Sequence, residues 1–457
     1  MAMLTVAAIA DRGLLGVAML LTTVLIGRWA GPDELGLFAL FFPLAFAAIA
    51  LQESLITAPY TIFATDLSCR EARRRYLGSV LLHTGVLSGT SCVVLLGVAA
   101  LLQVRGLSTY AAAVAVLAPV VPCILLREFA RRVVYADLKP QTAAVISGAA
   151  SIVQLLIMVA FYAAGRLTAV TAFAAIGVSS VVVGVAWVIV ERRTIRFDVT
   201  TLASSFARNW FLGRWITAAQ VGDVVRIHMF PWLLALAIDH RSVGIYAACA
   251  AIAGLSGPLQ IAISNLLLPQ FAAAAAKGGA AAADRLMWQA TAWLVAAMTL
   301  FTLAVGGVSG SIVPWLYGSE YLGSQTPLVL LLLAQLVIAA SLPAARALVA
   351  LRRPDMDFVS HAAGIAINLT AGLPLVLWWG ITGAAAAGLL GATVKAALTA
   401  VFYTREMRAR RSDASWGAPA LSEPTVTPPP ARLAAVGMRP ASYAATGAGK
   451  AWAEELS

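Results

Sequence analysis

GPDELGLFALFFPLAFAAIALQESLITAPY, residues 31–60, holds three acidic residues and no basic one. Gly31 and Pro32 interrupt a helix, and the two acidic residues after them belong to the same turn. The next 18 residues, 35–52, carry no charge. An apolar helix of about 20 residues spans the hydrocarbon core of a membrane. This stretch therefore predicts a tight turn followed by a membrane-spanning helix.

Similar apolar runs recur along nearly the whole chain. Of its 457 residues, 61% are hydrophobic and 12% are charged, and the mean hydropathy is +0.86. Soluble domains are about half apolar and about a quarter charged. The composition excludes a soluble enzyme, a disordered protein and a fibrous protein. Because barrel strands alternate within segments of roughly 10 residues, a β-barrel is excluded too. The predicted fold class is an all-α polytopic membrane protein.

Twelve stretches have the length and apolarity expected of membrane spans. They are residues 4–28, 35–62, 77–103, 109–126, 141–164, 167–190, 211–237, 243–270, 287–309, 326–348, 358–379 and 381–403. Turn-forming residues separate them, as Asp239, His240 and Arg241 separate the seventh from the eighth. We therefore expect about twelve transmembrane helices.

The basic residues fall on one side of this predicted membrane. The even-numbered connections and the segment after the twelfth span hold 22 of them. The odd-numbered connections hold four, namely Arg28, Arg105, Arg166 and Arg241. Basic loops stay in the cytoplasm, so both termini are predicted to be cytoplasmic. The net charge of +11 is then explained by topology, and no nucleic-acid partner is expected.

The two halves of the chain resemble each other. GPDELGLFAL (31–40) is followed by Pro59, and DHRSVGIYAA (239–248) is followed by Pro269. Each half has an even number of spans, so both halves have the same orientation and form parallel repeats. Two six-helix lobes favour an alternating-access transporter over a channel.

The repeats divide the chain into four predicted parts. An N-terminal six-helix lobe covers residues 1–195, and a cytoplasmic linker covers 196–210. A C-terminal six-helix lobe covers 211–404. The remainder, 405–457, is rich in Pro, Ala, Ser and Thr and is predicted to be a disordered cytoplasmic tail. A short helix near 449–456 is a further expectation within that tail.

Ionisable residues inside the spans indicate function, because a central charge costs roughly 2.5–3.5 kcal/mol to insert. Span seven carries Asp223 and Arg226 near its middle, with His228 and Pro231 just beyond. At spacing i, i+3 the first two lie on one helical face. They line a transport cavity, or they form a self-neutralising pair that only supports packing. Pro231 is expected to kink the helix.

Spans one and two carry further charges. Asp11 and Arg12 lie within the first span, in the inner part of the bilayer, and Arg12 either serves a site or extends to the cytoplasmic interface. Glu53 lies in the second span and is a candidate carrier of a proton or cation. The alternative for Glu53 is a structural pair with Arg12. The basic cluster from Arg127 to Arg132 is assigned to topology and lipid headgroups.

No enzyme site is indicated. The four cysteines form no CxxC or Cys/His cluster, so neither a metal site nor a cofactor is expected. A phosphate-binding GxxxxGK[ST] loop, an HExxH motif and a GxSxG motif are all absent from the sequence. The connections between spans are too short for a catalytic domain.

Five patches resemble Wzx-type polysaccharide flippases of the multidrug/oligosaccharidyl-lipid/polysaccharide (MOP) exporter superfamily. They are GRWAGPDELGLFAL (27–40), VGIYAACAAIA (243–253), NLLLPQFA (265–272), YGSEY (317–321) and WWGITGAAAAGLL (378–390). The resemblance covers residues 4 to about 404 and leaves the tail outside. It implies a MATE/MOP-like exporter with twelve helices in two lobes and a cationic central cavity.

That resemblance implies a flippase for an undecaprenyl-diphosphate-linked oligosaccharide in the bacterial cytoplasmic membrane. Its partners would be the lipid-linked oligosaccharide, membrane lipids and a polysaccharide polymerase or synthase. Arg12 and Arg226 would bind the headgroup, since a guanidinium binds phosphate bidentately. Asp11, Glu53 and Asp223 would couple an ion or pair with these arginines, and His228 would be accessory. Two rivals remain: a cation-coupled drug or metabolite antiporter of the same superfamily, and a non-transporting membrane scaffold that acts through its tail.

Overall fold

The computed structural model describes residues 2–64, 69–198, 202–351 and 353–412. Within these ranges the chain is almost entirely helical, and no strand occurs among them. The expected tail helix near 449–456 lies outside the described residues, as does most of the predicted tail.

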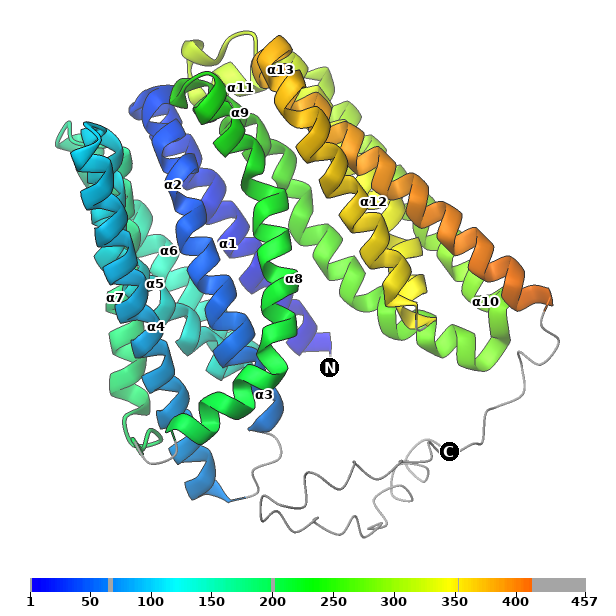
Figure 1. Ribbon diagram of the computed structural model, residues 1–457, viewed down its shortest axis with the longest axis horizontal. Coiled ribbons are helices and arrows are strands. Elements are labelled where there is room, and N and C mark those ends of the chain that lie inside the picture. Colours follow the sequence, from blue (N-terminus) through cyan, green and yellow to red (C-terminus); the bar gives the residue numbers. More distant parts are fainter. Residues whose placement is uncertain (1, 65–68, 199–201, 352, 413–457) are drawn as a thin grey trace. The chain divides into compact units, whose positions relative to one another are not determined.

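The first half of the chain forms seven α-helices and one π-helical turn (Figure 1). They are α1 Ala2–Trp29, α2 Gly31–Gln52, the π-helix η1 Glu53–Thr57, α3 Ala58–Phe63, α4 Arg70–Val104, α5 Ser108–Ala136, α6 Pro140–Ala163 and α7 Ala169–Glu191. α2, η1 and α3 follow one another directly, so together they form the second expected span.

The second half contains the longest helices. They are α8 Leu202–Ala237, α9 His240–Ala253, the 3-10 turn η3 Gly254–Ser256, α10 Gly257–Gly307, α11 Ser309–Tyr317, the 3-10 turn η4 Ser319–Tyr321, α12 Gln325–Ala350 and α13 Pro354–Ser412. Non-helical dihedral angles break α10 at Gly279 and α13 at Gly380. Each is therefore a pair of helices joined at a kink, and the break in α13 falls between the eleventh and twelfth expected spans.

Nine helices among the described residues are long and apolar enough to cross a membrane. The exact number of spans, predicted to be twelve, stays a prediction, as does the cytoplasmic position of the termini. Two expected boundaries differ in detail. α8 begins at Leu202, inside the predicted linker, and α13 continues to Ser412, inside the predicted tail. α8 also passes through Pro231 as one helix.

The helix ends gather in two groups that differ in chemistry. One group, here named the tight-turn end, holds turns at glycines with positive φ, at Gly31, Gly106, Gly165 and Gly318. Only glycine adopts such angles without steric cost. The other group, the basic end, holds the arginines near residues 70–75, 127–132 and 192–196. These two ends correspond to the odd-numbered and even-numbered connections of the sequence.

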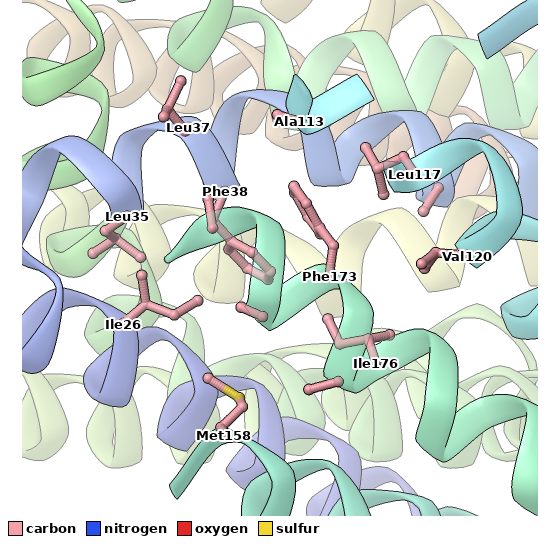
Figure 2. Close-up of a cluster of buried hydrophobic side chains, with 14 of the residues drawn as sticks. Ile26, Leu35, Leu37, Phe38, Ala113, Leu117, Val120, Met158, Phe173 and Ile176 are labelled. Atoms are coloured by element: carbon pink, nitrogen blue, oxygen red, sulfur yellow. The ribbon is translucent and has the colours of Figure 1, made fainter. Parts of the chain in front are cut away.

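The largest hydrophobic core among the described residues is built from α1, α2, α5 and α7 and continues into α9, α11 and α12 (Figure 2). Ile26, Phe38, Leu117 and Phe173 are essentially inaccessible. The rings of Phe38 and Phe173 stack with centroids 5.1 Å apart. Figure 2 shows these side chains pointing toward one another from neighbouring helices. This packing joins the helices of the N-terminal half to one another and to helices of the C-terminal half.

The outward surfaces of the helices are apolar as well. Val93 is 70% exposed, Leu300 71% and Leu236 86%. A soluble monomer rarely exposes large contiguous apolar patches, whereas acyl chains solvate such side chains in a membrane. With the apolar helices, this surface identifies a multi-pass membrane protein.

Candidate transport site

α1 contributes a fully buried carboxylate to the N-terminal half. The side chain of Asp11 is 0% exposed and accepts three hydrogen bonds from two other helices. Its donors are Arg131 Nη1 at 2.9 Å, the Tyr135 hydroxyl at 2.7 Å and Ser147 Oγ at 2.5 Å. Arg131 and Tyr135 belong to α5 and Ser147 to α6, so one carboxylate joins three helices.

Arg131 is the centre of this network. Besides Asp11, it contacts Glu128, with Nη2 and Nε lying 2.7 Å and 3.1 Å from Glu128 Oε2. Arg127 Nη2 donates to the other oxygen of Glu128 at 3.1 Å. Two carboxylates thus face two guanidinium groups, and the charges balance. Removing one member of a buried set leaves an uncompensated charge and costs about 3–5 kcal/mol.

Glu53 lies on the π-helical turn η1, beside this network. Its Oε2 lies 2.6 Å from Arg132 Nη2, and the preceding Gln52 donates to the carbonyl of Leu125 at 2.8 Å. The structure therefore gives Glu53 a partner on α5, where the sequence offered only Arg12. π-helical turns occur frequently at functional sites.

The same turn contacts the C-terminal half. Ser54 Oγ and Thr217 Oγ1 of α8 lie 2.8 Å apart, and a Cβ placed on Gly213 would lie 2.5 Å from the carbonyl oxygen of Ser54. η1 is thus held on one side by α5 and on the other by α8.

A small cavity of about 130 Å³ lies between α2 and α8. From α2 it is lined by Ala47, Ala50 and Leu51, and from α8 by Thr217, Gln220, Val224 and Val225. Val224 and Val225 belong to the helical turn that carries Asp223 and Arg226. The backbone of that turn therefore borders a space between the two halves.

Three of the predicted site residues have side chains outside the described part of the structure: Arg12, Asp223 and Arg226. Their backbones are helical, in α1 and α8. The structure places Asp11 and Glu53 in one charged region of the N-terminal half, and it does not place His228 there. The predicted grouping of all six residues stays a prediction.

His228 belongs to an aromatic group one turn further along α8. Its ring stacks on Phe46 of α2, with centroids 5.7 Å apart, and lies near Trp232 at 6.5 Å. Trp232 Nε1 donates to the carbonyl of Leu40 at 3.2 Å. His228 therefore helps α8 pack against α2.

At the tight-turn end the two halves meet through glycine. A Cβ on Gly36 of α2 would lie 1.7 Å from the carbonyl oxygen of His240. A Cβ on Gly244 of α9 would lie 1.9 Å from that of Pro32. These glycines hold matching places in the two repeated motifs, so the repeat marks a backbone-to-backbone crossing of α2 and α9.

Polar groups surround that crossing. Arg241 donates to Asp33 at 3.1 Å and to Glu320 at 2.9 Å. Thr23 Oγ1 and the Tyr317 hydroxyl lie 3.1 Å apart. α1, α2, α9 and α11 are thus in contact at the tight-turn end.

The role of Arg131 and Glu128 was missed from the sequence. Both were assigned to the membrane edge with the rest of the basic cluster, yet Arg131 is 4% and Glu128 6% exposed. The sequence did contain an indication of this role, because a carboxylate such as Asp11 within an apolar run requires a cationic partner. Arg131 and Glu128, at spacing i, i+3, already form one face of α5.

Comparison with solved structures identifies the fold of this chain. No family model matches the chain, and no curated protein matches it. Among solved structures, it is similar to an inward-facing multidrug resistance MATE family transporter of the MOP superfamily. The two are 14% identical with a TM-score of 0.72, over 89% of this chain and 100% of that one.

Two further solved structures are similar. One is a MOP superfamily transporter from Pyrococcus furiosus, 13% identical with a TM-score of 0.61, over 89% of this chain and 95% of that one. The other is the lipid II flippase MurJ in an inward closed conformation, 12% identical with a TM-score of 0.62, over 89% of this chain and 88% of that one.

These likenesses define the class of fold: a multi-pass membrane protein with the architecture of MOP superfamily transporters. The proteins that share it are transporters and flippases rather than enzymes. More particularly, the fold is common to a multidrug transporter and to a lipid II flippase, so the fold by itself identifies no substrate.

Proposed function

We propose that this protein is a flippase that moves a lipid-linked, undecaprenyl-diphosphate oligosaccharide across the bacterial cytoplasmic membrane by alternating access. The product would serve cell-surface or exopolysaccharide synthesis. The basic end would face the cytoplasm, in agreement with the positive-inside rule. The tight-turn end, where α2 crosses α9 at Gly36 and Gly244, would then face the outer side of the membrane.

The observation that carries the proposal is the position of the Asp223–Arg226 turn. Its two middle residues, Val224 and Val225, line the cavity between α2 and α8. A charged turn beside a space between two lobes is where a transporter of this fold would receive an ionic headgroup. Arg226, with Arg12 of the opposite half, would bind the diphosphate, because a guanidinium pairs with phosphate bidentately.

The acidic residues would have separate roles. Asp11 is already bonded to Arg131, Tyr135 and Ser147, which supports a pairing role rather than ion transport for this carboxylate. Glu53 is 30% exposed, and its ion-pair partner among the described residues is Arg132, so it would exchange a proton or a cation more readily than the fully buried Asp11. Asp223 would orient Arg226 from the preceding turn, and His228 would be accessory through its packing.

The test is a strain that lacks the gene and carries Arg226→Ala, with protein levels matched to wild type. We expect loss of surface polymer and accumulation of a lipid-linked oligosaccharide in membrane extracts, measured by mass spectrometry. Arg214→Ala is the matched control, since it removes the same charge from the same helix three turns earlier, where Arg214 lies over the ring of Phe211. Polymer at the wild-type level in Arg226→Ala would overturn the assignment.

A second candidate is a cation-coupled drug antiporter of the same fold. It is favoured by the lining of the cavity between α2 and α8, where Thr217 and Gln220 are the polar side chains and the rest are apolar. An unchanged lipid profile in the deletion strain, together with new sensitivity to cationic drugs, would favour this function. Glu53→Gln would then abolish drug resistance.

A further inference from the structure

A second cavity lies at the basic end, entirely within the N-terminal half. Its volume is about 350 Å³, within the range of pockets that bind small molecules. It is bounded by α3, α4, α5 and α7 and by the turn after α7. None of its lining residues belongs to the cavity between α2 and α8, so it is separate from the proposed transport path.

The floor of this cavity is apolar and its rim is cationic. Leu77, Val133 and Val134 supply apolar lining, while Arg70, Arg73 and Arg74 lie in the first turns of α4. The amino end of a helix adds partial positive charge from unpaired backbone N–H groups. Together these groups produce a positive potential above an apolar surface.

The acidic groups of the cavity are already engaged. Asp137 pairs with Arg73, and Glu191 accepts a hydrogen bond from Thr194 Oγ1 at 2.7 Å. Within the described residues, Arg70 and Arg74 have no carboxylate or hydrogen-bond partner for their side chains. Among the described lining residues, the three arginines outnumber the two carboxylates, so the cavity carries a net positive charge.

Trp187 supplies an independent indication of a ligand. This residue lines the cavity and is 6% exposed, and among the described residues its buried Nε1 has no hydrogen-bond partner. Its ring is held edge-to-face by Phe129, with centroids 5.9 Å apart. A buried polar atom left without a partner costs about 1–3 kcal/mol, so Nε1, which is enclosed in this structure, would gain a hydrogen bond if the ring turned toward an acceptor in the cavity.

The unsatisfied groups are all donors. A guanidinium and an indole N–H donate hydrogen bonds and accept none. A complementary ligand must therefore be anionic and rich in acceptor oxygens, with an apolar portion that fits the floor. We propose that this cavity binds a phosphate-bearing ligand, and that its source is the headgroup of an anionic membrane phospholipid held at the basic end. Basic pockets between transmembrane helices bind such headgroups.

The test uses the purified full-length protein. Wild type and variants are delipidated in neutral detergent, and dioleoylphosphatidylglycerol is titrated while bound lipid is counted by native mass spectrometry and thermal stability is recorded. Dioleoylphosphatidylcholine and inorganic phosphate are the two comparison probes. We expect phosphatidylglycerol to bind and to raise the unfolding temperature, and phosphatidylcholine to bind at least about tenfold more weakly.

Arg70→Gln with Arg74→Gln should weaken phosphatidylglycerol binding about tenfold, since two charge-assisted contacts are lost. Arg105→Gln with Arg166→Gln is the matched control, because it removes two exposed arginines from the tight-turn end of the same half. Trp187→Phe keeps the packing against Phe129 and removes the N–H, and it should weaken binding about threefold. If the double variant Arg70→Gln with Arg74→Gln does not fold, the binding of phosphatidylglycerol to Trp187→Phe tests the proposed site instead.

The outcomes separate the two sources of phosphate. Binding of phosphatidylglycerol that inorganic phosphate does not displace supports the lipid headgroup. Stabilisation by inorganic phosphate alone, lost in Arg70→Gln with Arg74→Gln, supports the phosphate site and assigns it a soluble ligand. Equal binding by the cavity variants and the control pair, or equal binding of the two lipids, would overturn the proposal.

Discussion

At the tight-turn end, α2 meets α9 backbone to backbone at Gly36 and Gly244, whereas near the basic end η1 meets α8 through the hydroxyl pair Ser54 and Thr217. The first contact leaves no space for a side chain. The second combines a close approach of Gly213 to the carbonyl oxygen of Ser54 with one hydrogen bond between side chains, beside a cavity. Two helix backbones in direct contact at glycines can separate only if the whole helices move apart. A hydrogen bond between two hydroxyls can break locally, at a cost of about 1 kcal/mol.

The charges at the two ends differ in burial. Near the basic end, Arg131 and Asp11 are 4% and 0% exposed. At the tight-turn end, Arg241 and Asp33 are 43% and 50% exposed. Breaking a buried ion pair leaves a charge in surroundings of low polarity. When an exposed ion pair breaks, water solvates each of the two charges instead. The comparison implies that the ion pair inside the N-terminal half resists separation more strongly than the exposed ion pair at the tight-turn end.

Asp11→Ala and Asp33→Ala test this difference with the same substitution. We expect Asp11→Ala to lower the free energy of unfolding by about 3–5 kcal/mol, because Arg131 keeps a buried charge with one partner fewer. Asp33→Ala should lower it by about 0–1 kcal/mol. Unfolding is measured in mixed micelles with increasing denaturing detergent. Equal effects of the two substitutions would show that burial of the pair has no energetic consequence.

Gly36→Ala tests the crossing of α2 and α9. The added methyl would overlap the carbonyl of His240, so the helices must move apart, at a cost of about 1–3 kcal/mol. That cost favours separation of the two halves by about 5- to 150-fold. The measurement is the labelling rate of a cysteine introduced at Tyr317, which is 1% exposed, in a background without the native cysteines.

Gly97→Ala is the control for this experiment, because a methyl at Gly97 would meet nothing within 4 Å. Alanine also favours the helix over glycine, so Gly97→Ala should be neutral or slightly stabilising. Gly244→Ala should reproduce the effect of Gly36→Ala, since the two glycines occupy equivalent places in the repeats. Labelling in Gly36→Ala at the rate of the Gly97→Ala control would contradict a steric crossing.

The sequence was sufficient for the membrane class, for the all-helical fold and for the two repeated motifs that contain these glycines. The membrane class, the all-helical fold and the pairing of the motifs at 31–40 and 239–248 follow from apolarity and from repetition, which are local properties of the chain. The contact of Gly36 with α9 did not follow, because distances between helices are tertiary. The repeat identified equivalent positions, and the fold brought them together.

The candidate site was less accessible to prediction, for a physical reason. Asp11 and Glu53 were identified because each is a charge within an apolar run. Their partners Arg131 and Arg132 were not, because a basic cluster at the end of a span looks the same whether it faces headgroups or a neighbouring helix. Burial decides between these readings, and burial depends on how α1 and η1 pack against α5.

Ser54→Ala and Thr217→Val examine the contact near the basic end. A double-mutant cycle should give a coupling energy of about 0.5–1.5 kcal/mol, the usual range for one hydrogen bond. Thr404→Val is the control for the threonine substitution, because among the described residues that hydroxyl donates to the carbonyls of Ala400 and Val401 in its own helix. Stability is measured as for Asp11→Ala. A coupling energy near zero would mean that the two hydroxyls contribute nothing to holding α8 on η1.

Arg241→Gln tests the interaction with the smallest expected energy, namely the exposed ion pairs around the crossing of α2 and α9. Arg241 pairs with both Asp33 and Glu320, and the hydrogen bonds to these carboxylates raise the pKa of its guanidinium. We expect a loss of about 0–1 kcal/mol in low salt that disappears in high salt, since ions screen exposed pairs. Labelling of the cysteine at Tyr317 should rise slightly in low salt only. If the rise persisted at high salt, Arg241 would act through packing rather than charge, and the tight-turn end would resemble the basic end more than its exposure indicates.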